Sequence, residues 1–343
     1  MDTQPASPVR IPTPQEVRKI HDESVRIMSI TMPYALKQMQ AMYERTPDQT
    51  HGRFVHYTTA EAALSIIRTK RFWLRNTNCM SDYREVQHGF DIFNRYFLDA
   101  AKRKAFVDAF DACAPGAADD AFLAFNNWWQ DLRLNTYIAC VSEHQDSEDT
   151  HGRLSMWRAF GGTGTRVGVV LRLPYVSISG ASLALNFSPV AYLSEPGARR
   201  VIDQVITNVQ ANRDYLRTLG REVLAQIVFQ IFASGIVCLK HEGFYEEREW
   251  RAIYTPKRWF SPIVESSTEV VAGVPQIIHK IPLDGSISPL TADLDFAQVF
   301  DRLIVGPTPY PWPIYAAFVE ALKAAGVPNP EERVFVSDVP MRT

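Results

Sequence analysis

Apolar residues along this chain follow two spacings, one typical of strands and one typical of helices. Short, largely apolar runs predict strands at 53–59, 71–76, 135–142, 166–173, 248–254, 276–283, 302–306 and 333–337. Helical spacing predicts helices over 59–70, from 90 to 132 with a break near 113–120, over 154–161, 197–213, 217–236 and 312–325. The glycine-rich stretch 161–165 lies directly before a strand and predicts a tight turn, because a phosphate-binding loop needs amides at a helix start.

The predicted strands and helices are interleaved irregularly and do not repeat as βα units. This order favours an α+β fold with a curved, mostly antiparallel sheet. Residues 51–343 are expected to form one such domain, with helical insertions near 90–132 and 197–236.

The first 50 residues differ from the rest. Residues 1–12 are rich in proline and small polar residues, which predicts a flexible segment. The sequence Thr13-Pro14-Gln15-Glu16 has the signature of a helix start, and Pro33 is expected to break the helix that follows. Residues 1–50 are therefore expected to form a flexible N-terminus and a helical arm that could dock on a partner.

Composition sets limits on the class of protein. Apolar residues make up 46% of the 343 residues, and the formal net charge of −2 gives no overall attraction to nucleic acid or anionic membranes. Four scattered cysteines form no CxxC pair, which disfavours a cysteine zinc site and fits a reducing cytoplasm. No signal peptide and no apolar run of about 18 residues is present, so no membrane association is expected.

Familiar catalytic motifs are missing from the sequence. It contains no GxGxxG, no GxxxxGKS, no HExxH and no GxSxG. His144 and His151 lie in an acidic loop that either holds a metal or, as the simpler interpretation, is a solvated flexible loop.

Two places carry candidate chemistry. His56 lies inside a short apolar strand, beside Tyr57 and before a capped helix, where it either binds a ligand hydroxyl or is a structural histidine. Glu247 and Glu249 are two apart, so both point to one face if the strand begins by residue 247. They form either a catalytic pair of carboxylates or an edge-strand ion-pair cluster, and Trp250 is expected to point into the core.

A family resemblance covers residues 51–343. The segments FVHYTTAEAALSIIRTKRFWLRN, MSDYREVQHG, LSMWRAFG with RVGVVL, EEREWR, LIVGP and VFVSDVPMRT occur in the order found in the domain of unknown function 2971 family. More weakly, a first strand with His-Tyr and a late strand with Glu-x-Glu resemble the ADP-ribosyltransferase fold.

The second resemblance implies NAD as a substrate. His56, with Tyr57 beside it, would hold a ribose hydroxyl of NAD, Glu249 would stabilise the oxocarbenium-like transition state, and Glu247 would orient the acceptor. In addition, Ser142 matches the last serine of the family's Ser-Thr-Ser strand, and Trp157 and Phe160 are the candidates for the aromatic residue that stacks on nicotinamide. The family's usual tyrosine is absent from that segment.

Three functional hypotheses follow. The resemblance implies an NAD-dependent ADP-ribosyltransferase or NAD glycohydrolase, acting on a protein, a nucleic acid or water, in a setting such as a bacterial toxin or phage-defence effector. Arg53, Arg75 and Arg153 are candidates to meet the pyrophosphate. The second hypothesis is a non-catalytic binding or regulatory module on the same fold. The third is a metal-dependent nuclease that uses Glu247, Glu249 and Asp82.

Overall fold

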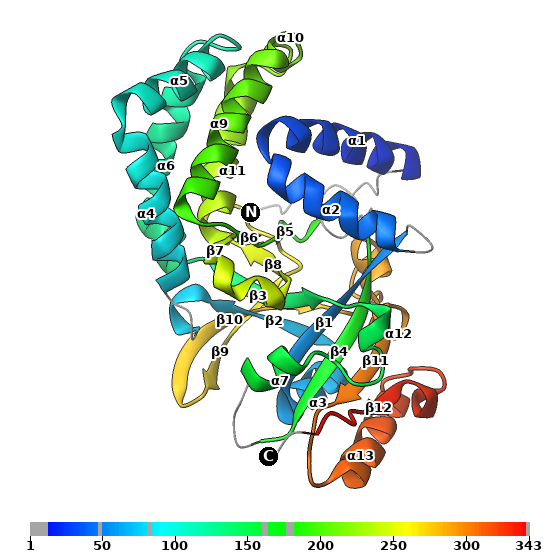
Figure 1. Ribbon diagram of the computed structural model, residues 1–343. Coiled ribbons are helices and arrows are strands. Elements are labelled where there is room, and N and C mark those ends of the chain that lie inside the picture. Colours follow the sequence, from blue (N-terminus) through cyan, green and yellow to red (C-terminus); the bar gives the residue numbers. More distant parts are fainter. Residues whose placement is uncertain (1–12, 47–49, 81–83, 160–163, 176–181, 341–343) are drawn as a thin grey trace.

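The protein has a mixed α/β architecture built on an open, mostly antiparallel sheet (Figure 1). The computed structural model describes residues 13–46, 50–80, 84–159, 164–175 and 182–340. The main sheet contains β1 (His51–Thr59), β2 (Arg71–Asn76), β3 (Tyr137–Glu143), β4 (Arg166–Pro174), β5 (Asn186–Pro189), β8 (Glu249–Tyr254), β9 (Glu265–Val271), β10 (Val274–Pro282), β11 (Phe300–Val305) and β12 (Val334–Val336). A separate parallel pair is formed by β6 (Ala191–Tyr192) and β7 (Leu239–Lys240).

The sheet divides into two branches at β3. Strand β8 pairs with β3 along residues 137–142 and so occupies one edge of β3. The other edge is shared, because β1 pairs with β3 at residues 142–143 and β2 pairs with it at residues 137–138. Beyond β1 the sheet continues through β4 and β11 to β12, and beyond β2 it continues through β10 to β9. The two branches therefore diverge between β1 and β2.

All eight predicted strands are present within a few residues of their expected bounds, and the predicted antiparallel character is confirmed, since only β11–β12 pairs in parallel within the described part of this sheet. Four further strands were not predicted: β5, β6, β7 and β9. Two of them contain only two residues, and β9 (ESSTEVV) is largely polar and exposed, so none has the apolar run that marks a buried strand. The predicted turn at 161–165 falls mainly outside the described residues.

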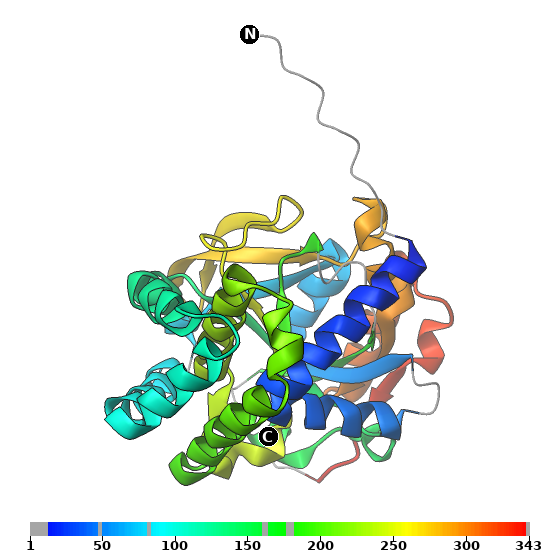
Figure 2. The same cartoon turned by 90° about the horizontal axis from the view of Figure 1, so that it is seen from above.

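Most of the described helices belong to two groups beside the sheet (Figures 1 and 2). One group is the helical insertion, made of α4 (Arg84–Leu98), α5 (Ala100–Asp111), α6 (Ala117–Leu134), α9 (Glu195–Ala211), α10 (Arg213–Arg217) and α11 (Arg221–Val237). It has its own aromatic-rich core. The other group comprises α3 (Ala60–Thr69), α12 (Phe296–Val299) and α13 (Pro311–Ala324), which cover one face of the sheet over the largest apolar core.

The opposite face of the sheet is covered by the short helix α7 (Leu154–Ala159) and by the end of α11. Trp157 of α7 is fully buried there against Tyr57, with the two ring centroids 4.8 Å apart. Its indole is so closely surrounded that a Cβ at Gly152 would lie 2.5 Å from the ring, and Gly152 has a φ of +68° that favours glycine. The α7 segment is therefore fixed by the packing of one indole.

The N-terminal arm consists of α1 (Pro14–Thr31) and α2 (Pro33–Arg45). The expected capping box is present, because the Thr13 side chain accepts from the Glu16 amide and the Glu16 carboxylate accepts from the Thr13 amide. The arm lies across the helical insertion: Glu23 accepts a hydrogen bond from Tyr215, and the Arg26 guanidinium lies 3.5 Å from the centroid of the same ring. Within the described residues, the arm is packed against its own chain.

Candidate functional site

A pocket of about 650 Å³ lies where the two branches of the sheet diverge. Its lining includes His56 from β1, Ser142 from β3 and Glu249 from β8, together with Glu247 from the 3₁₀ turn η3 (Glu242–Glu247). Segments far apart in the sequence thus meet around one pocket, whose volume is within the range of small-molecule sites. The distribution of strands explains the pocket, because β1 and β2 separate beside the same edge of β3.

His56 is held in a defined tautomer. Its Nδ1 lies 2.9 Å from the carbonyl oxygen of Cys140, between the points where β1 and β2 pair with β3. A carbonyl oxygen only accepts, so Nδ1 carries the proton and Nε2 is left as an acceptor on a neutral ring. Burial lowers the pKa of His56, and the bond to Cys140 offsets this only in part, which keeps the imidazole neutral at pH 7. The ring is further fixed edge-on against Phe72.

Glu249 is a buried and ionised carboxylate at the start of β8. Arg251 grips it with two bonds, Nε to Oε1 at 2.8 Å and Nη2 to Oε2 at 3.1 Å, and Lys240 Nζ lies 3.4 Å from Oε2. Burial alone would raise the pKa of Glu249, but the charges of Arg251 and Lys240, with the bonds donated by Arg251 and the Cys140 thiol, outweigh it and lower the pKa to about 2.

Glu247 lies close to Glu249, as predicted, but not because the two residues share a strand. The strand begins only at Glu249, and Glu247 is the last residue of η3, followed by Arg248 in the left-handed region with a φ of 44°. The premise that a shared strand places both carboxylates on one face is therefore wrong. Lys240 brings them together instead, because its Nζ lies 2.7 Å from Glu247 Oε2 as well as 3.4 Å from Glu249 Oε2.

Lys240 was not among the predicted site residues. It is 96% buried on a strand of only two residues, and its ammonium lies 4.8 Å from the ring centroid of Phe244. A lysine among charged neighbours has no local signal that it turns inward. Only the contacts with both glutamates show its place in the site.

Two further predicted residues line the pocket but are engaged in packing. Ser142 is 3% exposed and lies directly across from Glu249 in the β3–β8 register. Tyr57 is 5% exposed, and its hydroxyl accepts from the backbone N–H of Arg153 at 2.8 Å. Burial is the largest cause that raises the pKa of Tyr57, so its phenol stays protonated.

Trp157, one of the two predicted stacking aromatics, is not brought to the pocket. Trp157 is fully buried, donates its Nε1–H to the carbonyl of His151 and is not among the pocket-lining residues, so its assignment to nicotinamide stacking is corrected. The second candidate, Phe160, lies outside the described residues. Predicting the direction of an aromatic side chain on a short helix requires knowledge of the packing around it, which one sequence does not contain.

Phe244 is an aromatic residue that lines the pocket and was not predicted. It belongs to η3 and is 45% exposed, with the Lys240 ammonium over its ring, so part of the ring surface is open to a ligand. Phe72 and Trp73 of β2 line the pocket farther toward the diverging strands. The sequence signal for Phe244 was its position three residues before Glu247, in a segment without the apolar spacing of an α-helix.

Of the three candidate arginines, only Arg75 lines the pocket. It donates to the carbonyl of Cys79 and to the side-chain oxygen of Gln276, and no carboxylate in the described part of the chain forms an ion pair with it. Arg53 instead joins Asp146, Asp149 and Asp301 in an ion-pair cluster. Arg153 binds the Glu148 carboxylate and the backbone carbonyls of Glu143, Glu246 and Glu247. Both of these arginines hold loops together and do not face the pocket.

The acidic loop after β3 is anchored by a buried histidine and by ion pairs, while Asp146 on it stays exposed. The His144 side chain is fully buried, and its Nε2 lies 2.9 Å from Asp149 Oδ1. Asp149 also binds Arg53, so the loop is packed against β1 by charge. Among the residues described, no cluster of three or more potential metal ligands occurs, and Asp82 of the nuclease hypothesis lies outside them. In the same range of residues, no helix is both long and apolar enough to cross a membrane.

Comparisons with known proteins give one match. No curated protein and no solved structure matches the chain. The family model described as Protein of unknown function (DUF2971) matches residues 156–252, which run from α7 to Ala252 in β8 and include Lys240, Glu247 and Glu249. The match is shorter than the expected span of 51–343, and it shows a similarity to this family over residues 156–252.

Proposed function

We propose that the protein cleaves the bond between nicotinamide and ribose in NAD and transfers ADP-ribose to an acceptor or to water. The proposal rests on one observation: the neutral imidazole of His56 and the ionised carboxylate of Glu249 line the same pocket. The pocket is large enough to hold part of a dinucleotide. The resemblance of the His-Tyr and Glu-x-Glu strands to the ADP-ribosyltransferase fold supports the same proposal. A bacterial toxin or phage-defence effector is the setting that this analogy suggests.

Binding uses the side of the pocket near the diverging strands. His56 Nε2 accepts a hydrogen bond from a ribose hydroxyl, because Nδ1–H is already donated to Cys140. The exposed face of Phe244 stacks on nicotinamide, an aromatic ring that needs no charged partner. Arg75, which lacks a carboxylate partner among the described residues, meets the pyrophosphate.

Bond cleavage depends on Glu249. As nicotinamide leaves, the bonding electron pair goes to its ring nitrogen, and positive charge develops on the ribose carbon and ring oxygen. A carboxylate that stays ionised in a buried site stabilises this charge without reorganisation, an effect worth several kcal/mol. The low pKa of Glu249 guarantees its ionised form at any physiological pH.

Transfer then depends on Glu247. Its carboxylate is more exposed than that of Glu249 and lies at the same ammonium of Lys240. In this position Glu247 orients the nucleophile, either water or an acceptor group, and takes its proton. The acceptor proposed here is a protein or nucleic-acid group, with water as the route of the glycohydrolase.

The experiment is an assay of nicotinamide release from NAD by the wild type and by Glu249→Gln. The substitution preserves shape and removes the charge, so we expect the rate to fall at least about a hundredfold. Glu246→Gln, an adjacent exposed glutamate, is the matched control and should keep the wild-type rate. The proposal fails if the folded wild type releases no nicotinamide, or if Glu249→Gln retains the wild-type rate.

A second candidate function, a non-catalytic binding module, is favoured by one specific observation. Both oxygens of Glu249 are already occupied by Arg251 and Lys240, as in a structural ion-pair network. In that case NAD or a related nucleotide binds in the pocket without being cleaved. Calorimetric binding of NAD to a wild-type protein that releases no nicotinamide would support the module over the enzyme.

A further inference from the structure

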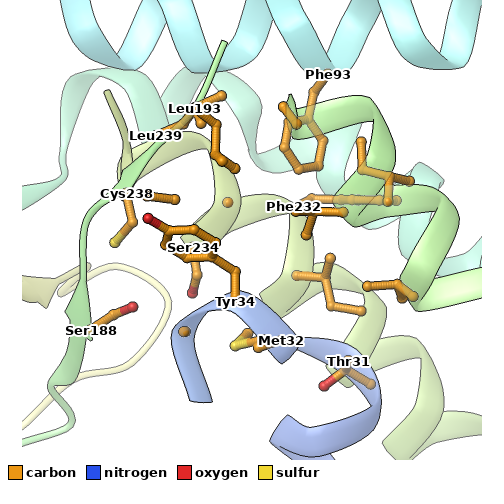
Figure 3. Close-up of a pocket in the computed structure, with 18 of the residues that line it drawn as sticks. Thr31, Met32, Tyr34, Phe93, Ser188, Leu193, Phe232, Ser234, Cys238 and Leu239 are labelled. Carbon is orange, nitrogen blue, oxygen red and sulfur yellow. The ribbon is translucent and has the colours of Figure 1, made fainter. Parts of the chain in front are cut away.

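A second cavity lies beneath the N-terminal arm, on the far side of β6 and β7 from the candidate site. It has a volume of about 110 Å³ and is lined by residues of the arm, α4, α9, α11, β5 and β7. Figure 3 shows side chains from these elements turned toward a common space, with Tyr34 of the arm extending across it and the rings of Phe93 and Phe232 opposite. None of the described residues that line it carries a charge.

We propose that this cavity binds a small uncharged molecule of about one ring, largely hydrocarbon with a single hydroxyl group, and that the bound molecule acts on Glu249 through β6 and β7. The volume of about 110 Å³ sets the upper limit at about one ring, because it is somewhat smaller than the roughly 150 Å³ of an apolar cavity that accommodates benzene. The lack of charge follows from the lining, where an ionised ligand would lose its hydration without gaining a partner.

The single hydroxyl follows from the polar side of the cavity. Figure 3 places the hydroxyls of Tyr34 and Ser188 and the thiol of Cys238 on the side of β5 and β7, away from the phenylalanine rings. Ser234 of α11 also lines the cavity, and its Oγ accepts hydrogen bonds from Asn186 and Gln230. A ligand with one polar group can therefore satisfy that group on this side and bury its ring on the other.

The coupling follows from the alternation of side chains along two paired strands. Ala191 and Leu239 pair across β6–β7 and line the cavity. The next pair, Tyr192 and Lys240, therefore points to the opposite face. Both of these residues hold Glu249: Tyr192 Oη accepts the backbone N–H of Glu249 at 2.8 Å, and Lys240 Nζ lies 3.4 Å from its carboxylate.

A shift of β6–β7 by an occupant is thus transmitted directly to the backbone and the carboxylate of Glu249. The distance involved is one residue on each strand. Since packed interiors deform as units, a ring inserted against Ala191 and Leu239 has few other ways to be accommodated.

The experiment titrates the full-length protein with phenol and, as a charged control of similar size, with benzoate. We expect phenol to bind, measured by calorimetry and by an increase in melting temperature, and benzoate to do neither. We further expect phenol to shift the backbone amide signals of Tyr192 and Glu249 in NMR spectra of the labelled protein. Neither readout uses NAD, so the outcome is independent of the proposed function.

Two variants make the test specific. Ala198→Leu fills the cavity from α9, and Ala35→Leu does so from α2; each should weaken phenol binding at least about tenfold while the protein stays folded. The control is Ala101→Leu on the exposed surface of α5, which should bind phenol as the wild type does. Absence of phenol binding, or binding that both filling variants retain, overturns the site. Binding that leaves the Tyr192 and Glu249 signals unmoved overturns the coupling.

Discussion

Glu249 and Lys240 illustrate how far single residues can be understood from sequence. The carboxylate was predictable, because a glutamate at the start of an otherwise apolar strand needs an explanation. Its partner Lys240 was not, because a two-residue strand gives no periodicity from which to infer burial. The prediction for Trp157 was wrong for a similar reason, because the direction of its side chain is set by residues that are distant in sequence. One of them is Gly306, where an added Cβ would lie 3.0 Å from the indole ring.

Replacement of Glu249 should change stability in a pH-dependent way. The pKa of Glu249 is lowered from 4.5 to about 2, so its stabilising contribution is fully present above pH 4.5 and is lost as pH falls toward 2. At pH 7 Glu249→Gln should cost roughly 3 kcal/mol of unfolding free energy, measured by urea denaturation.

The difference between the two proteins should shrink as the pH is lowered from 4.5 to 3. The exposed control Glu246→Gln should follow the wild type throughout. A gap between wild type and Glu249→Gln that stays constant below pH 4.5 would contradict the assignment of a strongly lowered pKa to Glu249.

At the scale of elements, the strands were more predictable than the short turns between them. Eight strands carry apolar runs that any buried strand needs, whereas η3 combines glycine, two aromatics and three glutamates without a regular pattern. Yet η3 supplies both Glu247 and Phe244 to the pocket. The part of the site that lies on a turn could not be oriented from sequence, because its direction depends on Lys240 and on the left-handed Arg248.

The two neighbouring aromatics of η3 provide a matched pair of variants. Phe244 lines the pocket, whereas Tyr245 is 62% exposed and does not. If Phe244 stacks on nicotinamide, Phe244→Ala should weaken NAD binding roughly tenfold, since stacking on one ring contributes about 1–3 kcal/mol. Tyr245→Ala should leave the dissociation constant within about twofold of the wild-type value. Titration calorimetry measures both constants, and equal losses in the two variants would rule out the stacking role.

For the molecule as a whole, the antiparallel sheet and its helical insertions were predictable, but the order of the strands was not. An apolar run indicates that a segment is a strand but does not indicate which strand it pairs with. Pairing joins residues as distant in sequence as Arg75 and Ile278. The branching at β3 is a property of this order. His56 and Glu249 could therefore be named as candidates, while their meeting around one pocket required the structure.

Ligand binding should stabilise the entire fold if the pocket holds NAD. Glu249→Gln is the suitable background, because it is expected to bind NAD without consuming it. At about 100 times the dissociation constant, NAD should add roughly 2.7 kcal/mol to the unfolding free energy and raise the melting temperature by a few degrees. The double variant His56→Ala/Glu249→Gln should lose most of this increase, and differential scanning fluorimetry reports both. An equal increase in the two proteins would remove His56 from the binding site.

The shared edge of β3 has a consequence for how such a site can vary. The recess forms because two strands that pair with the same edge of β3 diverge from each other. Main-chain pairing therefore creates it, and side chains only line it. Related proteins can differ in most of the side chains that line the pocket and still keep the same recess. New ligand preferences then arise through substitution of the lining side chains, without any change in how the strands pair.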